Sequence, residues 1–327
     1  MANSVLSAPH FQDEVAAFAY VEAHLWPNGP VCPFCGGTER IGRMNGKTTR
    51  LGLHKCYPCQ KPFTVRQGSI FESSHLALRY WLQAIHLMSA SKKGMSTRQM
   101  QRMFKCSMRT AWHLTHRIRE MMAMGKDALP PMGGSGKVVE ADETYFGPLP
   151  EHKRSEGKRP GRKWHQTVRG PSAKRAILSL VERGGEARSF YVENAPIEKV
   201  VKIVRDNVAK ESRLHTDESS LYRGVGKEFA DHERVVHSRK EYARGDVTTN
   251  TVEGFFSVFK RGMRGIYQHC SEAHLHRYLA EFDFRYSHRE KLGIDDVSRA
   301  GHALRGAKGK RLTYQTIGRS KQAQSEA

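Results

Sequence analysis

The sequence predicts an α+β multidomain protein, with a small metal-binding segment, then a helical region, then a larger α/β domain of strands and helices. Three features predict this order. Two cysteine pairs lie near the start, apolar residues recur at helical spacing over 74–124, and short apolar runs separated by turn residues begin near residue 138. With 327 residues, 38% of them hydrophobic, the chain is long enough for two or three domains with their own cores.

The first expected element is a short amphipathic helix over 11–25. It carries apolar residues at helical spacing and ends before a turn-forming cluster, Trp-Pro-Asn-Gly-Pro, at 26–30. Strand-like pieces follow at 54–57 and 62–65. We expect the helix and these strands to belong to one N-terminal domain over 1–72.

The cysteine pairs in this domain have the spacing of a metal site. Cys32 and Cys35 form one C-x2-C pair, and Cys56 and Cys59 form a second after 20 intervening residues. Four thiolates at these positions complete a tetrahedron, so the sequence predicts a zinc ribbon with a structural Zn²⁺. A disulfide-bonded arrangement is the alternative, but nothing else in the chain is typical of a secreted protein.

Residues 73–124 are predicted to form a helical region that binds DNA. Helices are expected over 74–89, 96–104 and 108–124. The last two are joined by a three-residue turn, which is the layout of a helix-turn-helix. The third helix carries Arg109, His113 and Arg117, the candidate DNA contacts. The alternative is a plain packing unit with a solvated basic face; the adjacent ribbon favours DNA binding.

A linker rich in glycine and proline over 125–137 precedes the α/β domain, which we expect over 138–292. Strands are expected at 137–146, 176–182, 187–192, 213–217 and 234–237, and helices at 196–210, 251–263 and 271–288. Three consecutive strands followed by alternating helices and strands is the order of a ribonuclease H-like sheet. Residues 153–175 are predicted to be an exposed loop, and 293–327 a flexible basic tail that lies along a phosphate backbone.

The formal net charge of +21 indicates a polyanionic partner. We expect double-stranded DNA and no membrane, because no basic amphipathic anchor is visible and the longest apolar run, around 76–90, is too short to span a bilayer. The opening residues show no signal peptide. These features predict a cytoplasmic, nucleoid-associated protein.

Three carboxylates are candidates for metal-dependent chemistry on that DNA. Asp142 lies within an apolar strand, Asp217 closes a second strand, and Glu253 lies in the first turn of a helix, with Lys260 two turns further along the same face. Paired divalent ions can hold the attacking and leaving oxygens of a phosphoryl transfer, and carboxylates are the hard oxygen ligands that Mg²⁺ or Mn²⁺ requires. Lys260 would then contact a phosphate.

Other interpretations of these acids remain open. Asn250 and Glu253 have the spacing of a capping box, so Glu253 would then satisfy only a backbone N–H. Asp217 has the position of a residue that starts a turn. Glu140, on the same strand face as Asp142, is a competing ligand, and the amide oxygen of Asn250 is an alternative third ligand.

Together these segments resemble the bacterial insertion-sequence transposases that have an N-terminal zinc ribbon and a DDE core, the ISXO-two-like group. The matching pieces span nearly the whole chain. They include Trp-Pro before the first cysteine pair, Asp-Glu-Thr-Tyr-Phe-Gly at 142–147, His-Thr-Asp at 215–217, and Asn-Thr-Val-Glu-Gly-Phe-Phe-Ser at 250–257 with Lys260. The interval of 35 residues between Asp217 and Glu253 is usual in DDE enzymes.

The resemblance implies a DNA transposase with Asp142, Asp217 and Glu253 as the catalytic metal ligands. Such an enzyme binds the terminal inverted repeats of its element and catalyses strand cleavage and strand transfer into target DNA, and the pairing of two ends implies at least a homodimer. Two alternative functions remain open: a non-catalytic zinc-ribbon regulator, and a nuclease that cuts DNA without joining it.

Overall fold

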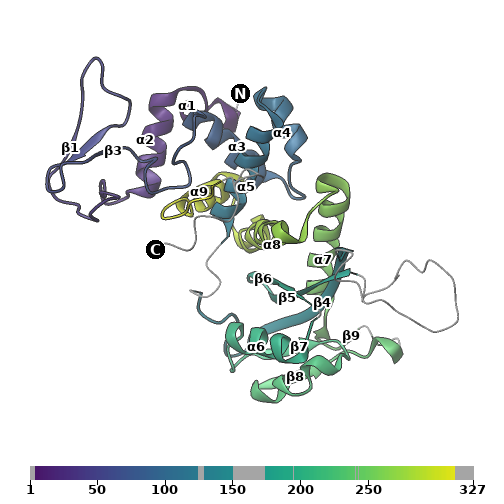
Figure 1. Ribbon diagram of the computed structural model, residues 1–327. Helices are drawn as coiled ribbons and strands as arrows, with labels where there is room; N and C mark the ends of the chain where they lie inside the picture. Colours follow the sequence, from purple (N-terminus) through teal and green to yellow (C-terminus); the bar gives the residue numbers. More distant parts are fainter. Residues whose placement is uncertain are drawn as a thin grey trace, which may run out of the picture. The chain divides into compact units, whose positions relative to one another are not determined.

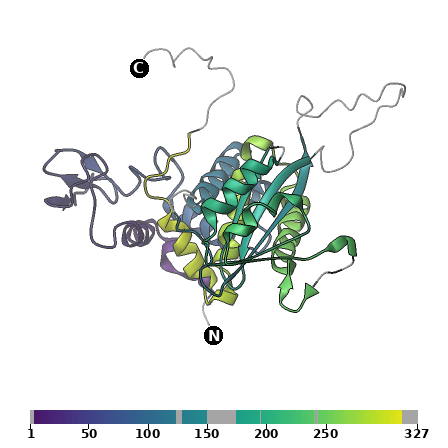
Figure 2. The same ribbon diagram turned by 90° about the horizontal axis from the view of Figure 1, so that it is seen from below.

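The computed structural model describes residues 4–123, 129–149, 174–193, 195–239, 241 and 243–313. The predicted loop over 153–175 lies outside the described residues, except for its last two positions. The chain divides into two compact units, shown from two directions in Figures 1 and 2. Unit 1 comprises Met1–Ile85, Thr97–Met121 and Gly301–Ala327, and unit 2 comprises His86–Ser96 and Met122–Ala300.

The N-terminal helix of unit 1 is broken in two, into α1 (Pro9–Gln12) and α2 (Glu14–Leu25). Asp13 separates them with an extended backbone, and its carboxylate accepts a 2.8 Å hydrogen bond from the Ala16 N–H. The continuous helix expected over 11–25 is therefore wrong at its start, because Asp13 is the N-cap of α2 and not an interior residue.

In the described part of the ribbon, the short strands β1 (Ile41–Arg43), β2 (His54–Cys56) and β3 (Pro62–Phe63) form an antiparallel sheet. The two expected strands are present in shortened form. β1 was not expected, because it contains a glycine and only one apolar residue. Phe63 is buried beside the cysteines, with Trp26 packed against it.

The helical segments that follow are α3 (Leu78–Ala90), α4 (Thr97–Phe104) and α5 (Met108–Met122). Their bounds lie within a few residues of the expected ones.

The expected flexible tail is wrong over its described part. Residues Asp296–Arg305 form helix α9, and Ala303, Leu304 and Ala307 are buried. The Lys310 ammonium donates to the Glu120 carbonyl oxygen at 2.7 Å. A few apolar residues among many basic ones are enough to bury part of this segment, which the average composition does not reveal.

The described strands of unit 2 form one mixed sheet in the order β6-β5-β4-β7-β8. Strands β4, β5 and β6 are antiparallel neighbours, whereas β7 and β8 run parallel to β4. β5 is buried along almost its whole length, as its run of branched apolar residues predicts for a central strand. The bounds are β4 (Val138–Pro148), β5 (Lys174–Glu182), β6 (Ala187–Val192), β7 (Arg213–Thr216) and β8 (Asp231–Arg234).

Helices cover both faces of this sheet (Figure 1). On one face α6 (Ile197–Asn207) packs its buried valines, with Tyr222, against β4, β5 and β7. On the other face α7 (Asn250–Gly262) and α8 (Glu272–Ser287) pack phenylalanines against β5 and β6. The sheet is therefore the middle layer of three, and acids on β4 can reach either side.

Three details of unit 2 differ from the expectation. The last strand is at Asp231–Arg234, not 234–237, because the edge strand is the charged segment that pairs with β7 and not the following valines. Between β7 and β8 the chain forms 3-10 turns at Ser220–Tyr222 and Val225–Glu228, which were not predicted. A short hairpin, β9 (Ala243–Arg244) and β10 (Val247–Thr248), precedes α7.

The described part of the predicted linker, 129–137, packs on unit 2. Met132 is buried, its N–H donates to the Asn207 carbonyl at 2.8 Å, and its carbonyl accepts from the Ala209 N–H at 2.9 Å.

Candidate active site and metal sites

Strand register brings two of the predicted acids together. In the parallel β4–β7 pair the last partners are Ala141 and Thr216, so Asp142 and Asp217 are the next residues on the two strands. β7 ends there, and an Asp217 carboxylate oxygen turns back to accept from the Ser219 N–H at 2.9 Å. The two carboxylates therefore lie at the carboxyl end of β7, where β7 no longer pairs with β4.

A third acid joins this cluster that the sequence analysis did not assign. Carboxylate oxygens of Asp142, Glu143 and Asp217 lie within 4.8 Å of one another. Glu143 was missed because neighbours on a strand point to opposite faces, so Asp142 appeared to exclude it. The β4–β7 pairing ends at Ala141 and Thr216, so β7 does not pair with Asp142 or Glu143. The register of β4 against β7 is the signal that would have indicated it.

Helix α7 contributes Glu253 and Lys260, which line one pocket of about 790 Å³ together with Asp142 and Glu143. Asn250 is exposed at the start of α7 and is not among the residues that line this pocket. The rest of the lining is Thr144, Phe256, Ser257, Arg261, Arg264 and Gly265. The pocket combines the acids of β4 and Glu253 of α7 with basic residues that lie further along the same helix and just after it.

The capping-box alternative does not describe the start of α7. Its N-cap is Thr249, whose hydroxyl donates to Glu253 at 3.1 Å. The backbone N–H groups of Thr251 and Val252 donate instead to Glu140, at 2.8 and 2.9 Å. Glu140, the competing ligand, therefore faces the helix terminus, and Glu253 is available to the pocket.

Burial, followed by the neighbouring negative charges, sets the electrostatics of the cluster. Burial, and then the Asp217, Glu143 and Glu253 carboxylates, raise the pKa of Asp142 to about 8. Burial also raises the pKa of Glu143 to about 7, against the opposing hydrogen bond that the Tyr222 hydroxyl donates to it. A bound proton or a bound cation relieves the repulsion between carboxylates held this close, and an all-oxygen donor set fits Mg²⁺ or Mn²⁺.

Divalent-ion affinity is expected to rise with pH. Because Asp142 has a pKa of about 8, it is largely protonated at pH 6, and an incoming cation must displace that proton. Apparent Mn²⁺ affinity should fall by up to about tenfold for each pH unit below 8. Calorimetric titration of the full chain at pH 6, 7 and 8 measures this. Asp142→Asn is the control, and affinity that is equally flat in both proteins would contradict the prediction.

The four cysteines form a zinc-ribbon-like metal site. Their sulfur atoms lie within 4.8 Å of one another, and all four are free thiols. The Sγ atoms of Cys32 and Cys59 are 3.6 Å apart, as are those of Cys35 and Cys56. A tetrahedron with Zn–S bonds of about 2.3 Å has edges of about 3.8 Å. The spacing thus suits zinc, and it exceeds the length of a disulfide bond.

The predicted DNA contacts on α5 have different surroundings. Arg109 is exposed in the first turn, and His113 is half-buried with its ring within 3.2 Å of the Leu312 carbonyl oxygen. Arg117 is buried and donates to the carbonyls of Leu312 and Glu72 at 3.2 and 3.1 Å. The prediction that Arg117 contacts DNA is wrong, because the guanidinium is used to join distant segments of unit 1.

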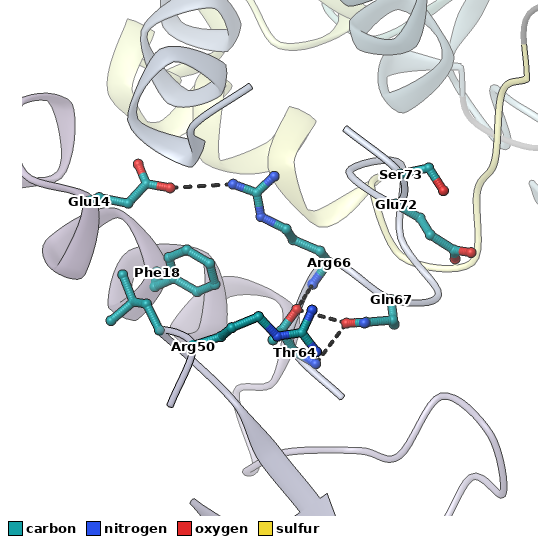
Figure 3. A pocket seen from close by; sticks show the side chains of 9 residues that line it. Glu14, Phe18, Arg50, Thr64, Arg66, Gln67, Glu72 and Ser73 are labelled. Atoms are coloured by element: carbon teal, nitrogen blue, oxygen red, sulfur yellow. Dashed lines mark hydrogen bonds and ion pairs between the residues drawn. The ribbon is translucent and has the colours of Figure 1, made fainter. Parts of the chain in front are cut away.

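A separate pocket of about 550 Å³ in unit 1 has mixed charge (Figure 3). The Arg66 side chain points to Glu14, 3.3 Å away, and also donates to the carbonyls of Ser74 and Leu76 at 3.0 Å. Its positive charge is therefore already neutralised. The exposed Arg50 side chain lines the other side of this pocket. Nothing among these residues matches the convergence of acids in unit 2.

Among the described residues, no helix has both the length and the apolar character that crossing a membrane requires.

Comparison with known proteins identifies two segments of the chain. Residues 133–287 match the family model of the ISXO2-like transposase domain, and residues 12–62 match that of the transposase zinc-ribbon domain. The chain is 28% identical over 269 residues to an uncharacterized protein in transposable element ISH50 of Halobacterium salinarum, covering 80% of this chain and 86% of that protein. The two family models together match more than half of the 327 residues, in the same order along the chain. The chain therefore belongs to the ISXO2-like transposases with an N-terminal zinc ribbon.

Proposed function

We propose that the protein binds the terminal inverted repeats of an insertion sequence and catalyses metal-dependent cleavage and transfer of DNA strands. Asp142, Asp217 and Glu253 are the metal-holding triad, and Lys260 contacts a phosphate. The single observation that carries the proposal is the acidic cluster that β4 and β7 form, because two of its members, Asp142 and Glu143, also line a pocket with Glu253 and Lys260 of α7. The strand order β6-β5-β4-β7-β8, with helices on both faces, supports a ribonuclease H-like domain.

The chemistry needs no energy-rich cofactor. In the first step a water oxygen bonds to phosphorus and the bond to the 3′ oxygen breaks, which leaves a 3′-OH. In the second step that 3′ oxygen bonds to a target phosphorus and a target 3′ oxygen leaves, so one phosphodiester replaces another. Bound divalent ions supply Lewis-acid stabilisation of the attacking and leaving oxygens.

Side chains from β4, β7 and α7 are positioned to hold the ions and a phosphate in these two steps. Asp142 and Asp217 present neighbouring carboxylates from adjacent strands, and Glu253, in the first turn of α7, lines the same pocket as Asp142. Burial, and then the charge of Arg264, lower the pKa of Lys260, and the Asp142 carboxylate opposes this shift. A cationic Lys260 beside the cluster is suited to hold a phosphate that the acids would otherwise repel.

DNA recognition is assigned to unit 1, through the zinc ribbon and the first turn of α5. Recognition helices of helix-turn-helix proteins present their N-terminal residues to base edges. On α5, Arg109 and Thr110 are exposed, whereas residues 114–119 are buried. The exposed turn, and not the middle of the helix, is therefore the part suited to contact DNA. Because two element ends must be joined together, we propose at least a homodimer in the active complex.

Arg109→Ala is expected to weaken binding to the element ends by roughly tenfold, since a base or phosphate contact from arginine contributes about 1–3 kcal/mol. Fluorescence anisotropy with labelled ends measures this. Lys202→Ala, which removes an exposed charge from α6, is the control. Arg117→Ala should instead lower the melting temperature, because it removes a buried side chain and its hydrogen bonds to the Leu312 and Glu72 carbonyls. Unchanged binding by the Arg109 variant would remove α5 from the interface.

The test of the proposed function is an insertion assay. A marker gene between the element's own flanking ends is supplied with the wild-type protein, and new insertions are counted and sequenced. Insertions bounded by the element ends support the transposase. Cut ends without joined products would indicate a nuclease, and bound but uncut ends would indicate a regulator.

A further inference from the structure

A buried carboxylate outside the pocket connects two of the elements that carry the acids. Glu140 on β4 is fully buried. It accepts hydrogen bonds from the Thr251 N–H at 2.8 Å, the Thr251 hydroxyl at 2.9 Å and the Val252 N–H at 2.9 Å, all on α7. The Arg183 Nε donates a further hydrogen bond at 2.6 Å. A buried charge persists only with such partners, so this contact fixes the start of α7 against β4.

Arg183 directly follows β5. It connects Glu140 to the hairpin before α7 and to β7, the third element that carries an acid. Its Nη1 donates to the Asp246 carbonyl at 2.6 Å, and its Nη2 donates to the Thr248 carbonyl at 2.9 Å and hydroxyl at 2.8 Å. Nη2 also lies 3.3 Å from Nδ1 of His215 on β7. Arginine has no acceptor, so His215 Nδ1 accepts and its proton is on Nε2, 3.6 Å from a Glu233 oxygen.

The positions of these residues follow one rule. Glu140 is two residues before Asp142, His215 is two residues before Asp217, and Thr251 is two residues before Glu253. Glu140 and His215 are themselves register partners across β4 and β7. On strands, residues two apart face the same side of the sheet. Glu140 and His215 therefore lie on the same side of the sheet as Asp142 and Asp217, one strand repeat earlier. Each of the three acids therefore lies two residues after a residue that Glu140 or Arg183 contacts.

We propose that Arg183 and Glu140 form a positioning clamp that sets the separation of Asp142, Asp217 and Glu253 for divalent-ion binding. This inference rests on the proposed metal-dependent function. Carboxylates that repel one another separate unless their backbones are fixed, and metal sites tolerate errors of only a few tenths of an ångström. Glu140 is paired with Arg183, so it holds α7 without adding an uncompensated negative charge beside the cluster. The clamp residues touch neither substrate nor ion.

The test measures Mn²⁺ affinity of the full-length protein by calorimetric titration. Arg183→Lys keeps the charge, but one ammonium cannot replace a fork that reaches Glu140, His215 and two carbonyls together. Glu140→Gln removes the charge at nearly constant volume. Both are expected to weaken Mn²⁺ binding by about tenfold or more, as loss of outer partners does at metal sites. Higher Mn²⁺ concentrations should restore strand joining in both variants.

Two further variants keep the test decisive. Thr251→Val removes one hydroxyl donor to Glu140 without changing the volume of the side chain, and it should weaken Mn²⁺ binding in the same direction by less. Thr251→Val tests the proposal if Arg183→Lys or Glu140→Gln fails to fold. Arg205→Lys is the matched control, because Arg205 forms an exposed ion pair with Glu228 at 2.6 Å. That variant should bind Mn²⁺ like the wild type.

The outcomes separate the clamp from the proposed function. Wild-type Mn²⁺ affinity in folded Arg183→Lys and Thr251→Val overturns the clamp, whatever the joining activity. Weakened affinity in a protein whose wild type never joins DNA supports the clamp and overturns the proposed function. A wild type that binds no Mn²⁺ overturns both.

Discussion

Replacing Asp217 with asparagine is expected to reduce strand joining by about a thousandfold or more while binding to the element ends persists. Loss of a metal-holding carboxylate removes several kcal/mol of transition-state stabilisation, and about 1.4 kcal/mol corresponds to a factor of ten. The fold should survive, because the asparagine oxygen can still accept the hydrogen bond from the Ser219 N–H. Joining is measured with purified protein, labelled ends and a target plasmid, and end binding is measured in the same preparation.

Glu218→Gln is the matched control for this prediction. It makes the same chemical change one residue further along, but the Glu218 carboxylate accepts from the Ser238 hydroxyl at 2.6 Å, and Glu218 is not part of the acidic cluster. Joining by this variant should equal that of the wild type. If Asp217→Asn retains joining, the carboxylate assignment is wrong. If it loses end binding as well, Asp217 supports the structure of the protein and not the reaction alone.

Local patterns were sufficient to predict the elements that carry the site. Asp142 was recognisable because a charge within an apolar strand is unusual, Asp217 because it closes a second strand, and Glu253 and Lys260 because their spacing equals two helical turns. The structure brings Asp142, Glu253 and Lys260 to one pocket and places Asp217 against Asp142. Each of these inferences needed only the residues of one segment.

The features that were not predicted depend on contacts between segments that are distant in the sequence. Glu143 belongs to the cluster only because β7 ends beside Asp142, and Arg117 is buried only because residues near 312 fold back over α5. Helix α9 was hidden by the basic composition around its few buried apolar residues. The role of Glu140 at the start of α7 likewise joins positions 111 residues apart. Sequence periodicity contains no information on such contacts.

Replacing Cys56 with serine is expected to unfold the zinc ribbon and abolish high-affinity end binding, while Mn²⁺ binding by unit 2 is retained. The described ribbon strands contain only two or three residues each, and its buried cluster is Cys32, Cys56 and Phe63. So small a core cannot offset the conformational entropy of the chain, whereas a structural zinc ion contributes about 10–16 kcal/mol to folding. Metal analysis should find one zinc per wild-type chain and almost none in the variant.

Cys106→Ser is the control, because Cys106 is a partly buried free thiol outside the metal site. It should retain zinc, protease resistance of the ribbon and end binding. Addition of a zinc chelator to the wild type should reproduce the Cys56 variant, and Zn²⁺ should reverse it. End binding that persists after the ribbon has lost zinc and become protease-sensitive would exclude the ribbon from the DNA interface. Recognition would then depend on the exposed first turn of α5, where Arg109 lies.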